Sequence, residues 1–317
     1  CTTYQSTSGT RYAGRMLDPS VEGTDYTRRF LFEAADVRGQ RVRLERTLDE
    51  VFERRPYPAA VASELAKALA AAALLSSTVK FDGRLTLQVR GRGPMPMLVA
   101  QALPEGGLRG IARWEDDEAV AAAAADPAAL YGEAELVIAI AAERDSEPYQ
   151  GIVPIQRGGL GASIEYYFAQ SEQLSTRVWL EARETTVTGL LLQRLPESSR
   201  GADSDELWQR VVSATERQAG SDLPHLGDET FLKRLFGEET LRLFAPTPLR
   251  FACGCSGART ASMIRALGPE EAGRILVEEG EIRVTCEFCG ATYRYDALDV
   301  GQIMSTGMWT PPGGRAQ

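Results

Sequence analysis

Hydrophobic and polar positions alternate in short runs through most of the N-terminal half of the chain. Runs with the two-residue period typical of half-buried strands are MLVAQAL, GIARW, AELVIAIAA, YQGIVPI, TRVWLEARE and VTGLLLQRL. An earlier run, RRFLFEAADVRGQRVRLERT, predicts a short helix followed by a strand that contains Val42 and Leu44. Strands mixed with a few helices, without a regular βαβ alternation, predict an α+β domain.

Helical periodicity occurs at three places among these strands. It marks LDEVFERR, residues 58–76 and GASIEYYFAQSEQ. The most apolar of the three contains Glu64 and Lys67. We therefore expect a buried core helix there, and not a membrane span, which needs roughly 20 apolar residues. Asp82–Gly83, a pair favoured in type I′ turns, joins two alternating runs in TVKFDGRLTLQVRG and predicts a hairpin.

A polar stretch, PESSRGADSDE, ends this α+β core near residue 197. Two short amphipathic helices are predicted after it: DELWQRVVSATERQ and, beginning at Asp228, DETFLKRLFGEE. Residues 203–246 include nine acidic and five basic residues. Because short helices are marginal in isolation, residues 198–247 are expected to form a metastable helical linker. On composition alone, an ordinary pair of interdomain helices explains the same pattern.

Composition and charge favour some classes of protein over others. The 317 residues are enough for about two domains. A content of 44% hydrophobic and 25% charged residues is that of an ordinary soluble globular protein. The net charge of −9 argues against a chain that mainly neutralises nucleic-acid phosphates. Residues 1–23 are polar and lack the apolar core of a secretory signal, so we expect a disordered extension and assign Cys1 no role.

Four of the five cysteines lie in two tight clusters: Cys253 and Cys255 in FACGCSG, and Cys286 and Cys289 in VTCEFCG. Such pairs occur as structural disulfides, metal sites, catalytic dithiols and redox sensors. A thioredoxin-like CxxC leads into a long helix. Here two strand-like runs, EIRVT and ATYRYDA, flank the motif and predict a hairpin, with Gly290 in the turn.

A metal site explains this context best. The single histidine, His225, is distant from the cysteines in sequence, so a four-coordinate site would consist of sulfur alone, a standard arrangement for structural zinc. The piece from about residue 248 to 300 is also small enough to need a metal or disulfide staple. If both motifs were CxxC, an ordinary structural zinc ribbon would be the simplest interpretation. Here the first motif is CxC, and a disulfide between its two cysteines closes a small, strained and labile ring. Loss of a structural zinc removes about 10 kcal/mol of folding free energy, so the pattern predicts an oxidation-sensitive switch.

CxC followed by CxxC resembles the C-terminal redox domain of the heat-shock protein 33 family, the oxidation-activated 33 kDa chaperonins. The runs RRFLFEAADVRG, TVKFDG, GRGPMPM, YQGIV and SEQLSTR resemble the core of that family, in the same order. The resemblance covers residues 24–305. It implies a core chaperone domain at 24–197, the linker at 198–247, a zinc-binding redox-switch domain at 248–305 and a flexible tail at 306–317.

The resemblance implies a cytoplasmic, ATP-independent holdase that oxidation activates under oxidative and heat stress. In the reduced state one zinc ion per chain would be bound by Cys253, Cys255, Cys286 and Cys289. Oxidation would release it and form the disulfides Cys253–Cys255 and Cys286–Cys289. The linker would then unfold and expose apolar surface to unfolding client proteins, and a homodimer of the oxidised form is compatible with this family. No catalytic residue, further cofactor, nucleic acid or membrane partner is expected.

Three other functions find less support in the sequence. GRGPMP lacks the Lys-Ser/Thr ending of a phosphate-binding loop, and a single histidine leaves no compelling Ser-His-Asp set, which argues against a hydrolase or transferase. A thiol–disulfide oxidoreductase is an alternative because of the cysteine pairs. A zinc-ribbon nucleic-acid binder is another, although residues 247–317 carry seven arginines against eight acidic residues. Tyr293 and Tyr295 are more simply explained by packing within the hairpin.

Overall fold

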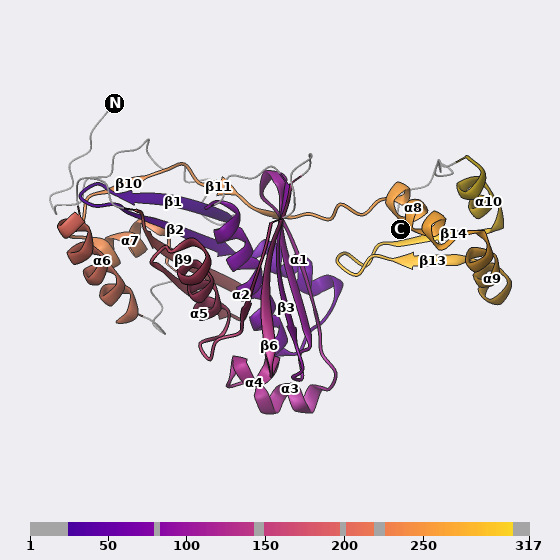
Figure 1. Cartoon of the computed structure of the whole chain (residues 1–317), viewed down its shortest axis with the longest axis horizontal. Coiled ribbons are helices and arrows are strands. Elements are labelled where there is room, and N and C mark those ends of the chain that lie inside the picture. Colours follow the sequence, from indigo (N-terminus) through magenta and orange to yellow (C-terminus); the bar gives the residue numbers. More distant parts are fainter. Residues whose placement is uncertain (1–24, 79–82, 143–148, 197–200, 219–225, 307–317) are drawn as a thin grey trace. The chain divides into compact units, whose positions relative to one another are not determined.

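The structure is a computed structural model of the whole chain. It describes residues 25–78, 83–142, 149–196, 201–218 and 226–306. The chain divides into two compact units, Cys1–Ala252 and Cys253–Gln317 (Figure 1). Mixed sheets and helices confirm the α+β class. The domain boundaries expected near residues 197 and 247 stay predictions.

The first unit contains two sheets, of which sheet A carries the linker helices. Its strands lie in the order β10, β1, β2, β9, β8, all antiparallel, and β11 also pairs with β1. Their bounds are β1 (Tyr26–Phe32), β2 (Val37–Leu44), β8 (Thr176–Arg183), β9 (Thr186–Arg194), β10 (Leu241–Leu243) and β11 (Thr247–Pro248). The short helix expected in RRFLF is wrong, because these residues form β1, with Phe30 and Phe32 buried on one face.

Sheet B has the order β12, β5, β4, β3, β6, β7, and only β12 runs parallel to its neighbour. The bounds are β3 (Gly83–Gly91), β4 (Met97–Leu103), β5 (Gly107–Arg113), β6 (Ala134–Ala142), β7 (Tyr149–Pro154) and β12 (Arg250–Phe251). The expected hairpin at Asp82–Gly83 has its first arm at residues 79–82, outside the described residues. Its second arm, β3, pairs with β4 on one edge and with β6 on the other.

Helix α2 (Ala59–Ser76) packs against strands of both sheets and forms the centre of the main hydrophobic core. By length and composition alone it could cross a membrane, but 67% of it is buried inside the protein, which confirms the expected core helix. Its buried carboxylate, Glu64, is paired with Lys67 at 2.7 Å and accepts a 2.8 Å hydrogen bond from Tyr131. These contacts offset the cost of burying a charge.

Four other helices of the first unit, which precede the linker, are short. They are α1 (Arg46–Arg54), α3 (Asp117–Ala123), α4 (Pro127–Tyr131) and α5 (Gly159–Tyr167), with a 3₁₀ turn at Pro104–Gly106 and a π-helical turn at Phe168–Glu172. Asp116 caps α3 by accepting from the Ala119 N–H at 2.8 Å. An aspartate at this position satisfies a backbone N–H that the first turn of a helix leaves unpaired.

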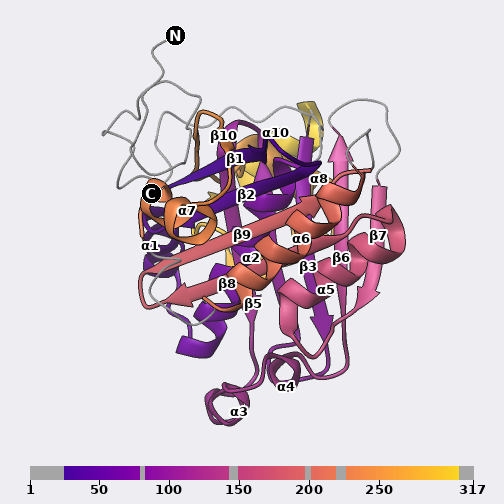
Figure 2. The same cartoon turned by 90° about the vertical axis from the view of Figure 1, so that its left-hand side faces the viewer.

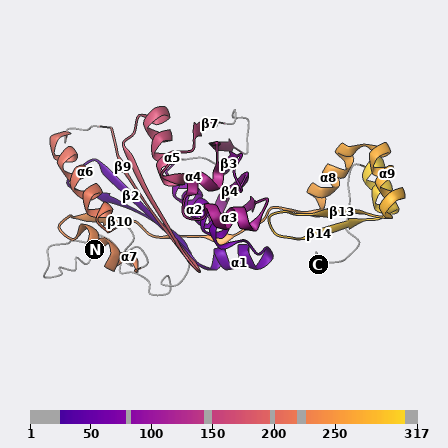
Figure 3. The same ribbon diagram turned by 90° about the horizontal axis from the view of Figure 1, so that it is seen from below.

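Both predicted amphipathic helices are present, as α6 (Gly201–Glu216) and α7 (Asp228–Phe236). Figures 2 and 3 show them on one face of sheet A, with α2 and α5 on the other. They share a second hydrophobic cluster with the sheet, which includes Phe30, Phe32, Leu192, Leu207, Val211, Phe231, Leu232 and Phe236. Apolar burial therefore attaches these short helices to the sheet, as their weak intrinsic stability requires.

The second unit is small. It consists of α8 (Gly257–Leu267), α9 (Pro269–Glu279), the hairpin β13 (Ile282–Thr285) and β14 (Thr292–Tyr295), and α10 (Ala297–Thr306). The hairpin is the one predicted from the two strand-like runs that flank CxxC. The core of this unit contains seven buried residues: Ala261, Ile264, Ala272, Ile282, Tyr295, Val300 and Ile303.

Candidate metal centre

The CxC pair directly precedes α8, and local hydrogen bonds fix its position. Ser256 caps the helix by accepting from the Arg259 N–H at 3.3 Å. The Arg259 guanidinium donates back to the Gly254 carbonyl at 2.5 Å. A Cβ atom at Gly254 would lie 2.8 Å from that guanidinium. The residue between Cys253 and Cys255 is therefore held tightly against the first turn of α8.

The CxxC pair lies in the turn between β13 and β14, as the sequence predicted. The Cys286 N–H donates to the Ala291 carbonyl at 2.9 Å, and the Gly290 N–H donates to the Cys286 carbonyl at 2.8 Å. Gly290 has φ = +72°, a left-handed conformation that glycine adopts at no steric cost. The turn thereby directs both cysteine side chains to one side, at the tip of the hairpin that the flanking strands predicted.

The four sulfurs converge at one point. All of their Sγ atoms lie within 4.8 Å of one another, and this is the one group of that kind found in the described part of the chain. The shortest separations join the two motifs, with Cys253 to Cys286 at 3.6 Å and Cys255 to Cys289 at 3.3 Å. All four are free thiols, because a disulfide would bring two sulfurs to about 2.05 Å.

This arrangement fits a tetrahedral metal site. A zinc–sulfur bond of about 2.3 Å places the sulfurs of a tetrahedron roughly 3.8 Å apart, close to the observed separations. Burial raises the pKa of the Cys289 thiol, and hydrogen bonds with the neighbouring thiols raise it further, whereas a backbone hydrogen bond from Ala291 lowers it. Four thiols this close do not all lose their protons unless a cation compensates the charge.

Two tyrosines on β14 have different roles near the cysteines. Tyr295 is fully buried, and its hydroxyl contacts the Thr260 hydroxyl and the Gly257 carbonyl, so its interpretation as hairpin packing is confirmed. Tyr293 instead donates a 3.3 Å hydrogen bond to the Cys255 sulfur. This bond raises the pKa of Tyr293. This bond was not predicted from the sequence, although the two-residue period of β14 puts both tyrosines on the same face.

The structure therefore brings all four predicted cysteines together, while their role as zinc ligands stays a prediction. Cys1 and His225 lie outside the described residues. Glu270 and Glu271 occupy the first turn of α9, where negative charges interact favourably with the helix dipole.

Comparisons with known proteins agree on one family. The family model described as Hsp33 protein matches residues 25–296. The 33 kDa chaperonin of Nitrosococcus oceani is 42% identical over 291 residues, which are 92% of this chain and 98% of the relative. That of Pseudomonas syringae pv. syringae is 40% identical over 286 residues, covering 89% and 94% of the two chains. The crystal structure of the 33 kDa chaperonin from Thermotoga maritima matches with a TM-score of 0.73 at 21% identity, covering 89% of this chain and 98% of that one.

Proposed function

The chain belongs to the Hsp33 family and is a redox-regulated chaperone, and from this premise we propose that its four-cysteine cluster is a zinc centre that controls client binding. The observation that carries the proposal is the convergence of four sulfurs from two motifs within 4.8 Å. One zinc ion per chain would be held by Cys253, Cys255, Cys286 and Cys289 in the reduced state.

Zinc supplies folding free energy to a unit that has little of its own. A single hydrophobic core below about 70 residues rarely contributes more than about 3–5 kcal/mol, whereas a structural zinc contributes about 10–16 kcal/mol. The second unit has seven buried core residues. Its fold would therefore depend on the four thiolates remaining available.

Oxidation removes those thiolates in pairs. Each disulfide, Cys253–Cys255 or Cys286–Cys289, forms when two thiols together lose two electrons and two protons. Hydrogen peroxide accepts both electrons and both protons and becomes two molecules of water. A disulfide within either motif removes two of the four ligands, so the site no longer meets the four-coordinate requirement of structural zinc.

Release of the two linker helices would couple oxidation to client binding. Helices α6 and α7 cover an apolar face of sheet A that includes Phe30 and Phe32, which are 1% and 2% exposed. We expect oxidation to release these helices and expose that surface to unfolding clients. Holding a client in this way needs no catalytic residue and no ATP. We assign the protein to the cytoplasm, where thiols stay reduced in the absence of stress, with a homodimer as the expected oxidised form.

One experiment tests the proposal directly. Zinc release is followed with a colorimetric chelator while the same sample is assayed for suppression of the aggregation of a thermally unfolding enzyme, with and without peroxide and mild heat. Zinc release and client holding should rise together. Folded reduced protein without zinc, or client holding before any zinc is released, would contradict the proposal. Insulin reduction with turnover would instead indicate an oxidoreductase, and a salt-dependent gel shift a nucleic-acid binder.

A further inference from the structure

A buried cluster of charges lies between α7 and sheet A. Arg28 on β1 and Arg41 on β2 are 5% and 1% exposed, and the register of the sheet places them directly opposite each other. Like charges at opposed positions of a sheet repel. The Asp228 carboxylate, at the start of α7, lies between them, 3.1 Å from the Nη1 of Arg28 and 2.7 Å from the Nη1 of Arg41.

Further contacts tie the same two elements together. The Tyr26 hydroxyl donates to the Asp228 carboxylate at 2.7 Å. The Arg41 guanidinium lies 4.3 Å from the centre of the Phe231 ring and also donates to the Leu226 carbonyl. Within residues 226–231, the Asp228 carboxylate, the Phe231 ring and the Leu226 carbonyl therefore all contact the Arg41 guanidinium.

Both guanidinium groups share the Asp228 carboxylate of α7, and arginine stays protonated in proteins. Among the described residues, the Nε of buried Arg28 and the Oδ2 of Asp228 have no hydrogen-bond partner. Burying a charge without a full set of partners is costly, so this part of sheet A favours an anionic group and retains affinity for one when α7 is absent.

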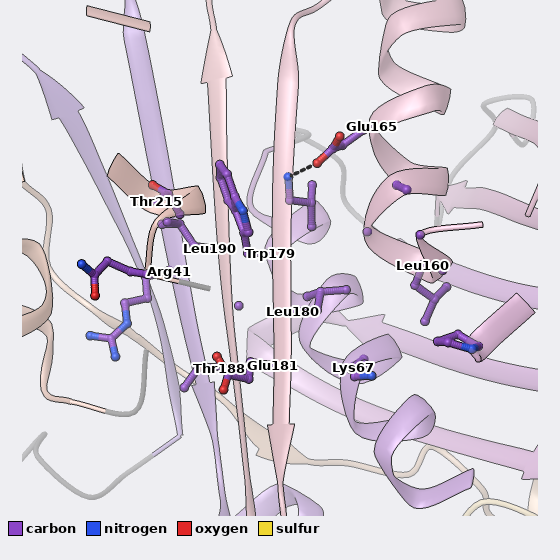
Figure 4. Close-up of a pocket in the computed structure, with 18 of the residues that line it drawn as sticks. Arg41, Lys67, Leu160, Glu165, Trp179, Leu180, Glu181, Thr188, Leu190 and Thr215 are labelled. Atoms are coloured by element: carbon purple, nitrogen blue, oxygen red, sulfur yellow. Dashed lines mark hydrogen bonds between the residues drawn. The ribbon is translucent and has the colours of Figure 1, made fainter. Parts of the chain in front are cut away.

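An apolar surface surrounds the arginines on the same face. Phe30 and Phe32 follow Arg28 at alternate positions of β1, and the Phe236 ring of α7 lies 6.0 Å and 5.3 Å from their ring centres. Arg41 also lines a cavity of about 450 Å³ (Figure 4). Residues of β9, α6 and α7 form one part of its wall (Thr188, Leu190, Thr215, Phe231 and Leu235), and residues of α2, α5 and β8 form the rest, among them Lys67, Leu160, Glu165 and Leu180.

We propose that this face of sheet A is a binding site for client segments that combine apolar side chains with a carboxylate, and that α7 is the internal ligand that occupies it before activation. The pattern to be recognised is that of α7 itself, an acidic residue three positions before an aromatic residue and seven or eight positions before further apolar ones. The inference rests on the proposed function, in which oxidation releases α6 and α7.

The arginine pair gives this site a chemical preference that an apolar surface lacks. A client segment with a well-placed Asp or Glu replaces the contacts of Asp228, whereas a purely apolar segment buries both guanidinium groups and supplies no carboxylate to them. Charge-assisted hydrogen bonds to arginine are also stronger than neutral ones. We therefore expect acidic amphipathic segments to bind more tightly than their neutral counterparts.

The test uses two fluorescent peptides that span residues 227–239, GDETFLKRLFGEE and the same sequence with Asp228→Asn. Anisotropy measures their binding to the oxidised and to the reduced full-length chain. The oxidised chain should bind the Asp peptide about tenfold or more tightly than the Asn peptide, in line with the strength of a hydrogen bond to a charged group. The reduced chain, with α7 in place, should bind both weakly.

Variants of the full chain test whether the two arginines cause the preference for the Asp peptide. Arg41→Met keeps the length of the side chain but removes its charge, and should abolish the preference for the Asp peptide. Arg28→Met serves as the second variant if the first does not fold. Arg194→Met is the matched control, because Arg194 pairs on the same sheet with an exposed carboxylate, Asp205, and should leave the preference unchanged.

The outcomes separate this inference from the proposed function. An oxidised chain that does not suppress client aggregation refutes the proposed function. An oxidised chain that holds clients but binds both peptides equally, or keeps the preference in both arginine variants, refutes this inference alone. Equal binding of the Asp peptide by the reduced and oxidised chains refutes it as well, since α7 would then not be the competitor.

Discussion

Replacing Cys289 by serine tests whether the cysteine cluster maintains the fold of the second unit. The Cys289 sulfur lies 3.3 Å from that of Cys255 and is one of the four that converge. Serine has nearly the same size and keeps the turn at Gly290 possible, so the substitution removes the sulfur ligand with little steric change. We expect the reduced variant to bind zinc weakly and to hold clients partly without oxidant.

The magnitude follows from the zinc site and the size of the core. About 10–16 kcal/mol of zinc binding free energy, shared by four ligands, corresponds to about 3 kcal/mol for each. Such a loss weakens zinc binding roughly a hundredfold. It also equals most of the roughly 3–5 kcal/mol that a core of this size supplies. Cys289→Ser should therefore increase the opened population of the second unit roughly a hundredfold.

Hydrogen exchange with mass spectrometry measures this effect by region. Peptides from residues 257–306 should lose protection in reduced Cys289→Ser, while α2 stays protected within the main core. Met263→Ser is the control, because Met263 is 60% exposed on α8 and its loss should change nothing. Stoichiometric tight zinc together with oxidation-dependent holding, as in the wild type, would refute the reasoning.

Three further predictions concern the order of oxidation, the hydroxyl near the site and the linker. During a peroxide time course, mass mapping should find the CxxC disulfide before the more strained CxC disulfide, and the reverse order would contradict this. Tyr293→Phe should speed zinc release by peroxide, because the Cys255 thiolate loses its hydrogen bond. Tyr295→Phe should instead lower the free energy of unfolding of the second unit by about 1 kcal/mol, because the buried hydroxyl loses its hydrogen bond to the Gly257 carbonyl. Phe236→Ala should cost about 3–5 kcal/mol of packing and make α7 protease-sensitive in the reduced protein, whereas the exposed Lys233→Ala should not.

Much of the fold was predictable where a local pattern matched the packing. Helix α2 is apolar on nearly all sides and is buried between two sheets, and β3 alternates between buried and more exposed residues over most of its length. β1 was mispredicted because its character depends on partners far along the chain. One edge pairs with β10 at Leu241–Leu243, and no local rule reveals that pairing. Phe30 also packs its ring over Gly39 of β2, where a Cβ atom would lie 2.0 Å away.

In the candidate site, too, local features were predictable and long-range contacts were not. Cysteine spacing and the flanking strands were sufficient to predict the sulfur cluster, since both motifs are local and their chemistry is specific. The Tyr293 hydrogen bond was not predictable, because it joins residues 38 positions apart. The same is true of Asp228, which the sequence identifies only as a helix start, while its carboxylate neutralises arginines 187 or more residues earlier in the chain.

The charges beneath α7 also help to explain how a helix can be held in one place and still be released. Docking α7 removes Arg28, Arg41 and Asp228 from water, and the cost of that desolvation cancels much of the attraction between them. Their net contribution to stability is therefore small, while a displaced or inverted α7 would bury the arginines without the Asp228 carboxylate, at a cost of several kcal/mol. The charges thus specify the position of α7, and apolar contacts such as Phe236 against Phe32 supply most of the attraction. Because release returns the charged groups to water, a modest loss of support is enough to undock the helix, and a client segment that buries the arginines again must offset their desolvation with a carboxylate of its own.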